Sequence, residues 1–91
     1  MFSLPIEMRV RYLQRRNCDL EIIKRAIFNN SIEEINTIGH QWMGNARSFG
    51  FESLESIAYE LENIELENLS KQGPRLIQDF SDWLKINSKL N

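Results

Sequence analysis

The chain contains one histidine, His40, and the residues around it predict that it lies on the outer side of a helix. At about 100° per residue, the apolar side chains of this stretch gather on one side. They are Ile35, Ile38, Trp42 and Phe49. His40 falls close to the opposite side, so we expect its imidazole to project into solvent. The residues that share its face are Asn36, Thr37, Met43, Gly44 and Arg47.

An exposed imidazole titrates near neutral pH and can act as a nucleophile. The simplest such role is to accept a phosphoryl group from another protein. That role needs a reachable ring nitrogen, open space, and a cationic or hydrogen-bonding neighbour for the phosphate oxygens. The sequence does not contain the sets of residues that other chemistries require. A lone histidine, with Cys18 in a different predicted helix, makes no metal site. No catalytic carboxylate pair, Gly-rich phosphate loop or nucleophile elbow is recognisable.

Gly44 lies one turn after His40 on the same helix face. A glycine inside a helix costs about 0.5–1 kcal/mol relative to alanine. One explanation is functional: the missing side chain clears space for a bulky group or for another protein's backbone. A slight kink, or chance, is the structural alternative. Gly39 flanks the apolar face and could allow close helix packing, and Gly50 is expected to mark the turn into the next helix.

The stretch HQWMGNARSFG resembles the signature of histidine-containing phosphotransfer (HPt) domains. That signature is a histidine, two residues, Lys-Gly and a small polar residue, with a second glycine six positions after the first. His40, Gly44 and Gly50 match this spacing, and Gly39 with residues 49–51 is similar to one subset of the family. The resemblance implies a four-helix bundle that spans residues 1–91 as one domain. It also implies a phosphocarrier of two-component relays without kinase activity of its own.

By this resemblance, His40 is the phosphoacceptor and exchanges a phosphoryl group with the aspartate of a response-regulator receiver domain. A histidine kinase is the other implied partner. Gly44 would leave room for the phosphoryl group and the approaching receiver. The residues expected to meet the partner are Asn36, Thr37, Met43, Gly44 and Arg47. No cofactor or metal is expected in the chain itself, because the Mg²⁺ would belong to the receiver.

The chain departs from the family at the lysine three residues after the histidine, which is Met43 here. Methionine cannot assist a phosphate electrostatically. Arg47 projects from the same face one turn beyond Gly44 and could supply the charge, since a guanidinium suits phosphate oxygens. Gln41 could donate a hydrogen bond to the phosphate. Arg47 and Gln41 are equally well explained as solvated surface residues, with Arg47 paired to Glu33 or another neighbour. Asn45 retains a polar group where the family has Ser or Thr.

The elements that must position these residues are all predicted to be helices, because no stretch alternates apolar and polar residues as a strand would. The first is expected from about Pro5, with Ser3 as a cap, to Asn29. The second begins at a capping box, Ser31-Ile32-Glu33-Glu34, and runs to about Ser48. The third is expected at 51–68, and Gly73-Pro74 should open the fourth. Short connections then favour an antiparallel four-helix bundle.

Each predicted helix carries an apolar stripe that should face the core. On the first helix the stripe is Ile6, Val10, Leu13, Leu20, Ile23 and Ile27, while Met8, Tyr12, Ile22 and Phe28 either widen it or form an exposed patch. The third contributes Leu54, Ile57, Leu61 and Ile64. The fourth contributes Leu76, Ile77, Phe80, Trp83 and Leu84.

Composition and charge limit the remaining possibilities. The net charge is −2, with arginines concentrated in the first third and glutamates between residues 52 and 67. Two solvated faces that attract each other across a bundle explain this pattern. A single cysteine, no membrane-spanning run and no signal-peptide pattern favour the cytoplasm. We expect a monomer without nucleic-acid or membrane partners.

Two alternatives to a phosphocarrier stay open. The first is a pseudo-HPt adaptor, which binds a receiver or a histidine kinase without using His40 as phosphoacceptor; Met43 is the residue that favours it. The second is a helical interaction domain unrelated to signalling, in which His40 is an ordinary surface residue. The joint spacing of His40, Gly44 and Gly50 argues against this second alternative. A nucleic-acid binder is less favoured still, because the chain is acidic and its basic first helix lacks interleaved exposed aromatics.

Overall fold

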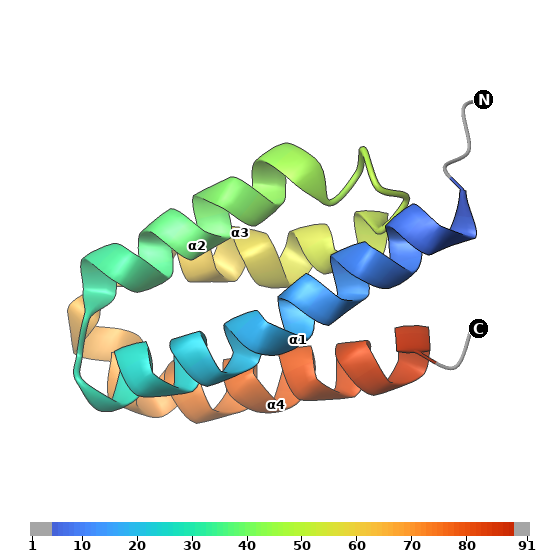
Figure 1. Cartoon of the computed structure of the whole chain (residues 1–91). Coiled ribbons are helices and arrows are strands. Elements are labelled where there is room, and N and C mark those ends of the chain that lie inside the picture. Colours follow the sequence, from blue (N-terminus) through green and yellow to red (C-terminus); the bar gives the residue numbers. More distant parts are fainter. Residues whose placement is uncertain (1–4, 89–91) are drawn as a thin grey trace.

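The computed structural model describes residues 5–88, which contain helices and no strand. Its elements are α1 (Ile6–Phe28), α2 (Ile32–Asn45), the 3₁₀ helix η1 (Glu52–Leu54), α3 (Glu55–Asn63), the 3₁₀ helix η2 (Leu66–Asn68) and α4 (Leu69–Ser88). The chain reverses direction from each α-helix to the next, as Figure 1 shows. The expected all-helical fold with four α-helices is confirmed for this part of the chain.

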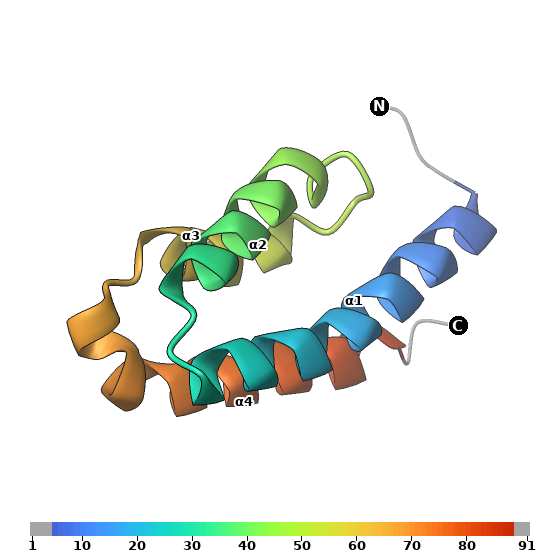
Figure 2. The same cartoon turned by 60° about the vertical axis from the view of Figure 1, so that its left-hand side comes forward.

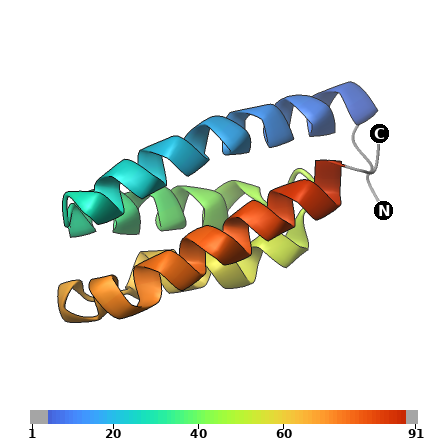
Figure 3. The ribbon, with the colours of Figure 1, turned by 90° about the horizontal axis from the view of Figure 1, so that it is seen from below.

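The bundle consists of two helix pairs, α1 with α4 and α2 with α3 (Figure 2). The 23 residues of α1 span about 35 Å at about 1.5 Å per residue, which is most of the 40 Å length of the molecule. Seen from below, α1 and α4 extend along the same direction (Figure 3), and Figure 1 shows that α1 diverges from α4 towards its N-terminus. His40 belongs to the other pair, so α3 is its closest neighbouring helix. No helix within residues 5–88 is long and apolar enough to cross a membrane.

The core between the two pairs is built from aliphatic and aromatic side chains of all four α-helices. The largest fully buried side chains are Trp42, Phe80, Ile23, Ile35, Leu54, Leu61, Leu69 and Leu76. Trp42 packs on Phe80 with ring centroids 4.5 Å apart. The expected core face of α2 is confirmed at Ile35, Ile38 and Trp42, whereas Phe49 is half-buried.

The apolar stripe of α1 is only partly the predicted one. Leu13 and Ile23 are buried as expected, but Ile6 is 58 % exposed, which contradicts its assignment to the core. Ile6 lies in the first turn of α1, at the end of the bundle, where no helix covers it (Figure 1). Tyr12 is buried instead, while Met8 and its fellow candidates Ile22 and Phe28 are exposed.

The connection between α1 and α2 forms without the predicted capping box. Ser31 is the N-cap residue of α2, but its side chain makes no capping hydrogen bond. The amide of Ser31 donates to the carbonyl oxygen of Ala26 at 2.8 Å, in the turn that ends α1. The Glu34 carboxylate therefore has no amide of Ser31 left to accept from. Asn30, with φ +57°, provides the left-handed residue of this turn. The proposed Ser3 cap lies outside the described residues.

The second helix ends earlier than predicted, at Asn45 rather than about Ser48. Residues 46–50 continue as turns, and the amide of Phe51 donates to the Ala46 carbonyl at 2.8 Å. The amide of Gly50 donates to the Arg47 carbonyl at 3.0 Å, which completes a Schellman-type ending. Gly50 has φ +85°, so the prediction that it makes this turn is confirmed.

The prediction of one helix over 51–68 is wrong, because the structure divides this range into the 3₁₀ helix η1, the helix α3 and the 3₁₀ helix η2. Residues 52–54 are 3₁₀, α3 covers only Glu55–Asn63, and Ile64 is extended with φ −67° and ψ 140°. The side-chain amide of Asn36 donates to the carbonyls of Leu61 and Ile64 at 2.8 and 3.2 Å. α3 can therefore end here without leaving these carbonyls unpaired.

The fourth helix begins at Leu69, not at Gly73-Pro74, so that prediction is also wrong. The buried stripe of α4 starts at Leu69, which is 1 % exposed, and Pro74 lies inside the helix on its exposed side. A Cβ on Gly73 would lie 2.9 Å from Cγ2 of Ile27 on α1. Gly73 therefore permits the close packing of α4 on α1 rather than starting a helix.

Candidate functional site

His40 projects from α2 with 77 % of its side chain exposed, as its position on the helix predicts. Its Nδ1 lies 2.6 Å from Oε2 of Glu62 on α3, a contact between residues 22 positions apart. A carboxylate that is ionised only accepts hydrogen bonds, so Nδ1 carries the hydrogen in this pair. The neutral ring then presents the lone pair of Nε2 on its other side. The contact therefore favours the tautomer with the hydrogen on Nδ1, in which Nε2 is the nucleophilic nitrogen.

Gly39 explains why Glu62 can reach His40. A Cβ on Gly39 would lie 2.7 Å from the Ala58 carbonyl oxygen and 2.9 Å from Cα of Glu62, and it would also clash with the Glu62 amide. These are backbone atoms, so no side-chain movement could relieve the overlap. The absence of a side chain at Gly39 thus lets α2 and α3 touch backbone to backbone beside His40. We call this contact the α2–α3 seam.

One turn before His40, Asn36 forms hydrogen bonds across the seam. Its amide holds the carbonyls of Leu61 and Ile64, the residues on either side of the end of α3, and is half-buried. Asn36 was predicted to face a partner, but its amide is used within the chain. Thr37, another predicted partner residue, is exposed and its hydroxyl donates to the Glu33 carbonyl at 2.8 Å.

Gly44 differs from Gly39 in having nothing close to it. No heavy atom lies within 4 Å of a Cβ built at Gly44, apart from the atoms of its own helix turn. Packing therefore does not require a glycine here. The open space lies on the face of α2 that carries His40, where the sequence predicts room for a bulky group.

Met43, at the position of the family's lysine, and Arg47, its predicted substitute, both make their contacts with other parts of the chain. Met43 is half-buried and packs against the core. Arg47 Nη2 lies 2.8 Å from Glu55 Oε1, and its Nη1 lies 3.5 Å from Glu52 Oε2. The hydrogen bond to Glu55 and the two negative charges raise the pKa of Arg47. Within residues 5–88, the only ion pair of His40 is the one with Glu62, which is also its only side-chain hydrogen-bond partner.

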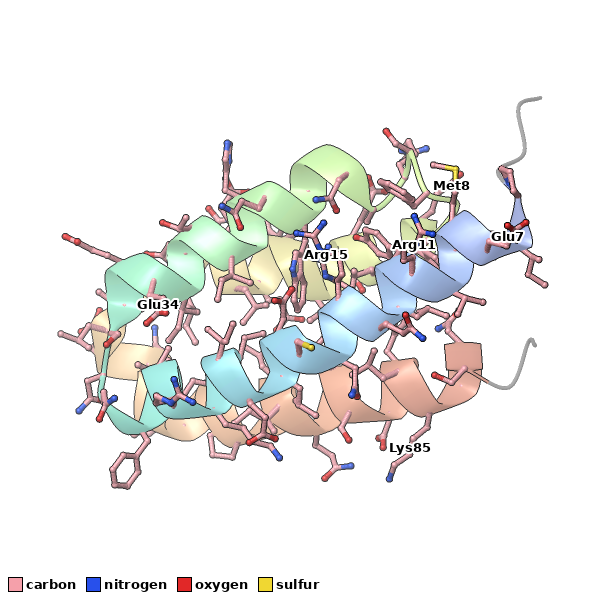
Figure 4. All side chains as sticks on the ribbon, in the orientation of Figure 1. Glu7, Met8, Arg11, Arg15, Glu34 and Lys85 are labelled. Atoms are coloured by element: carbon pink, nitrogen blue, oxygen red, sulfur yellow. The ribbon has the colours of Figure 1, made fainter. Side chains whose placement is uncertain are left out.

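Gln41 and Asn45 lie on the side of α2 that is next to α1. They line a groove of about 480 Å³ between α1 and α2, which we call the α1–α2 groove. Its other lining residues are Met8, Arg11, Tyr12, Arg15, Arg16 and Phe49. The Tyr12 hydroxyl donates to Asn45 Oδ1 at 2.6 Å, so Asn45 ties α2 to α1. Figure 4 shows Met8, Arg11 and Arg15 along the side of α1 that faces α2.

Sequence reasoning found His40 and its exposure but missed Glu62. The only signal was Gly39, which indicated close packing without naming the helix it packs against. Among residues 5–88, no three His, Cys, Asp or Glu side chains come together as a metal site would require. Comparisons of the chain with protein-family models, with curated proteins and with solved structures give no match.

Proposed function

We propose that this chain is a histidine phosphotransfer protein of a two-component phosphorelay, which carries a phosphoryl group on Nε2 of His40. The observation that carries the proposal is the 2.6 Å contact of Nδ1 with Glu62 on a ring that is 77 % exposed. This contact directs the hydrogen to Nδ1 and leaves Nε2 accessible and nucleophilic. The open space at Gly44 supports the same role.

In the proposed step, the Nε2 lone pair of His40 attacks the phosphorus of an aspartyl phosphate on a receiver domain. The N–P bond forms as the P–O bond to the aspartate breaks, and the aspartate leaves as a carboxylate. The imidazole gains positive charge while its Nδ1–H points at Glu62. The negative charge of Glu62 then stabilises the phosphorylated ring. The reverse step returns the phosphoryl group to an aspartate.

The face of α2 around His40 also defines what the partner must supply. Because Arg47 is held by Glu55 and Glu52, charge for the phosphate oxygens comes from the receiver and its Mg²⁺. The chain therefore acts as a carrier, not as an enzyme. In this proposal it is a monomeric single domain that works in the cytoplasm, and its partners are a receiver domain and a histidine kinase.

The lack of a cation beside His40 favours one alternative, a pseudo-HPt adaptor. Met43 is half-buried and Arg47 is engaged by two carboxylates. An adaptor would bind a receiver or a histidine kinase through the same face while His40 stays unmodified. The two functions differ only in whether Nε2 accepts phosphate, so the experiment must measure that step directly.

The test is to incubate the protein with phosphoramidate, a small donor that needs no docking surface. The Nε2 of His40 would displace ammonia from phosphorus, and ³¹P NMR distinguishes the Nε2 from the Nδ1 product. We expect acid-labile label at Nε2 of the wild type and none in His40→Gln. Glu62→Gln keeps a hydrogen-bond acceptor beside Nδ1 but removes the negative charge that stabilises the phosphorylated ring, so it should slow labelling about 10-fold. Glu65→Gln, a change of the same kind on the same acidic stretch, should label at the wild-type rate.

A second arm uses receiver domains from the source organism, each phosphorylated with acetyl phosphate in the presence of Mg²⁺. Transfer of label to the wild type but not to His40→Gln would support the phosphocarrier. If neither phosphoramidate nor any receiver labels His40, the phosphocarrier proposal is wrong. Binding of one receiver without any transfer would then identify the adaptor.

A further inference from the structure

A second groove, of about 450 Å³, lies between α3 and α4, and we call it the α3–α4 groove. Residues of α3, of the connection after it and of α4 line this groove, among them Tyr59, Asn63, Ile64, Glu65, Arg75 and Leu76. Neither His40 nor Glu62 belongs to the lining. The α3–α4 groove is therefore a surface separate from the candidate site.

The groove already accommodates one guanidinium, that of Arg75. Its Nη1 lies 2.9 Å from Asp79 Oδ2, its Nε donates to Gln72 Oε1 at 3.0 Å, and its Nη2 pairs with Glu60. Carboxylate and amide oxygens of α3 and α4 thus surround a planar cation, which is the chemistry that arginine recognition uses elsewhere in proteins.

The groove also has acceptors that Arg75 does not use. Glu65 is exposed, and within residues 5–88 its carboxylate takes part in no ion pair and no side-chain hydrogen bond. The Asn63 side chain donates to the Tyr59 carbonyl at 2.8 Å, which leaves its Oδ1 to accept another hydrogen bond. Because the chain has no lysine or arginine between residues 48 and 70, the stretch that carries these acceptors supplies no cation of its own.

The remaining wall of the groove is aromatic and apolar. Tyr59 is 60 % exposed, Ile64 is half-buried and Leu76 is buried. A guanidinium over a tyrosine ring is attracted to the electrons of the ring face. The methylene stem of an arginine covers apolar surface while its charged end reaches polar atoms. An exposed ring, an apolar surface and an unpaired carboxylate therefore fit one long cationic side chain better than a metal ion, for which no ligand cluster exists within residues 5–88.

We propose that the α3–α4 groove binds an arginine side chain of a partner protein, with the guanidinium against Tyr59 and paired with Glu65. Charge complementarity argues for such a partner, because a basic segment supplies the cation that residues 48–70 lack. A nucleic acid does not fit, since its phosphates would meet the carboxylates of Glu60 and Glu65. The inference does not rest on the proposed function, because His40 takes no part in it.

The test is a ¹H–¹⁵N NMR titration of the full chain at physiological salt with N-acetyl-arginine amide. N-acetyl-citrulline amide, which carries a neutral urea of nearly the same shape, is the matched control ligand. We expect saturable shifts of the backbone amides of residues 59–65 with the arginine compound, at a Kd on the order of 1–10 mM, and none with the citrulline compound. No saturable shift with the arginine compound, or equal shifts with both compounds, would overturn the proposal.

Variants of the groove locate the binding site. Glu65→Gln and Tyr59→Leu should each weaken binding of the arginine compound about 3- to 5-fold, by loss of the carboxylate and of the ring. The matched control is Glu67→Gln, which makes the same change in net charge at an exposed residue outside the groove lining and should bind like the wild type. Equal weakening by Glu65→Gln and Glu67→Gln would show a general attraction to the acidic stretch and overturn the site. The same spectra report whether each variant is folded.

A second copy of this chain is another possible source of arginine, because its first helix presents exposed residues such as Arg11 and Arg15. Self-association in sedimentation that disappears in Glu65→Gln would assign the groove to this copy and overturn the proposal of a different partner. We expect a monomer. Tighter binding of N-acetyl-lysine amide than of the arginine compound would overturn the choice of arginine. Since none of these measurements involves His40, the groove and the phosphocarrier can be refuted separately.

Discussion

The α2–α3 seam and the α1–α2 groove lie along two sides of the same helix, but they are packed very differently. In the seam, Gly39 brings two backbones into contact and Asn36 satisfies the carbonyls at the end of α3. In the groove, α1 and α2 leave a space of about 480 Å³, and two arginines on its rim have no partner within residues 5–88. The close seam holds Glu62 against His40, whereas the groove keeps α1 and α2 apart and leaves Arg11 and Arg15 exposed.

The largest loss of stability should come from Gly39→Ala, which disrupts the α2–α3 seam. The added Cβ meets the backbone of Ala58 and Glu62, so the two helices must separate. We expect the free energy of unfolding to fall by about 3 kcal/mol, the upper end of the usual cost of overpacking. Urea denaturation measures the change. A loss smaller than that of a typical surface substitution would show that the seam is not closely packed in solution.

Asn36→Ala should weaken the seam without a steric clash. It removes the donor of two hydrogen bonds and leaves the Leu61 and Ile64 carbonyls without that partner. We expect a loss of about 1–2 kcal/mol in the free energy of unfolding. Labelling of His40 by phosphoramidate should also slow, since Glu62 lies between the two carbonyls in sequence and loses its fixed position. Thr37→Ala, which deletes one exposed hydrogen bond within its own helix, is the control: it should leave labelling unchanged and should not lower the free energy of unfolding, because alanine favours a helix more than threonine does.

Gly44→Ala should change the free energy of unfolding in the opposite direction from Gly39→Ala, although the chemical change is identical. Nothing lies within 4 Å of the added Cβ, so only the helix preference for alanine acts. We expect a gain of about 0.5–1 kcal/mol in the free energy of unfolding. Phosphoramidate labelling should be retained, and transfer from the larger receiver should slow if the space is needed. A destabilised Gly44→Ala protein would contradict the open environment of this glycine.

The smallest effect on stability should come from the ionisation of Tyr12, which lines the α1–α2 groove. Burial raises its pKa, and this exceeds the lowering by the nearby Arg16. Below the unfolded pKa of about 10, both states keep the phenolic proton and stability does not change. Above it, the unfolded state loses the proton first, so stability falls as the pH rises towards the folded pKa. In Tyr59→Phe, Tyr12 is the remaining tyrosine, and its tyrosinate absorbance should appear at higher pH when folded than in urea.

Local pattern was sufficient for features that depend on one helix or one turn. The 100° spacing of apolar residues placed Trp42 inside and His40 outside, because a helix rotates its side chains by a constant angle. Gly50 was identifiable because a left-handed residue ends many helices. At Gly73-Pro74 the same reasoning predicted the wrong start for the fourth helix. The local preference for a helix start was outweighed by the burial of Leu69, which extends α4 towards its N-terminus.

The sequence by itself therefore determined the helical character of residues 5–88 and an outward histidine, whereas the tertiary structure shows that Gly44 beside it has no packing role. Only the tertiary structure decided that Glu62 meets His40, because that contact joins two helices and depends on how closely Gly39 lets them approach. It also decided that Arg47 turns to Glu55, since competing carboxylates are visible only when the loop after α2 is in place. Periodicity fixes the direction of a side chain, whereas its partner depends on packing between elements distant in sequence.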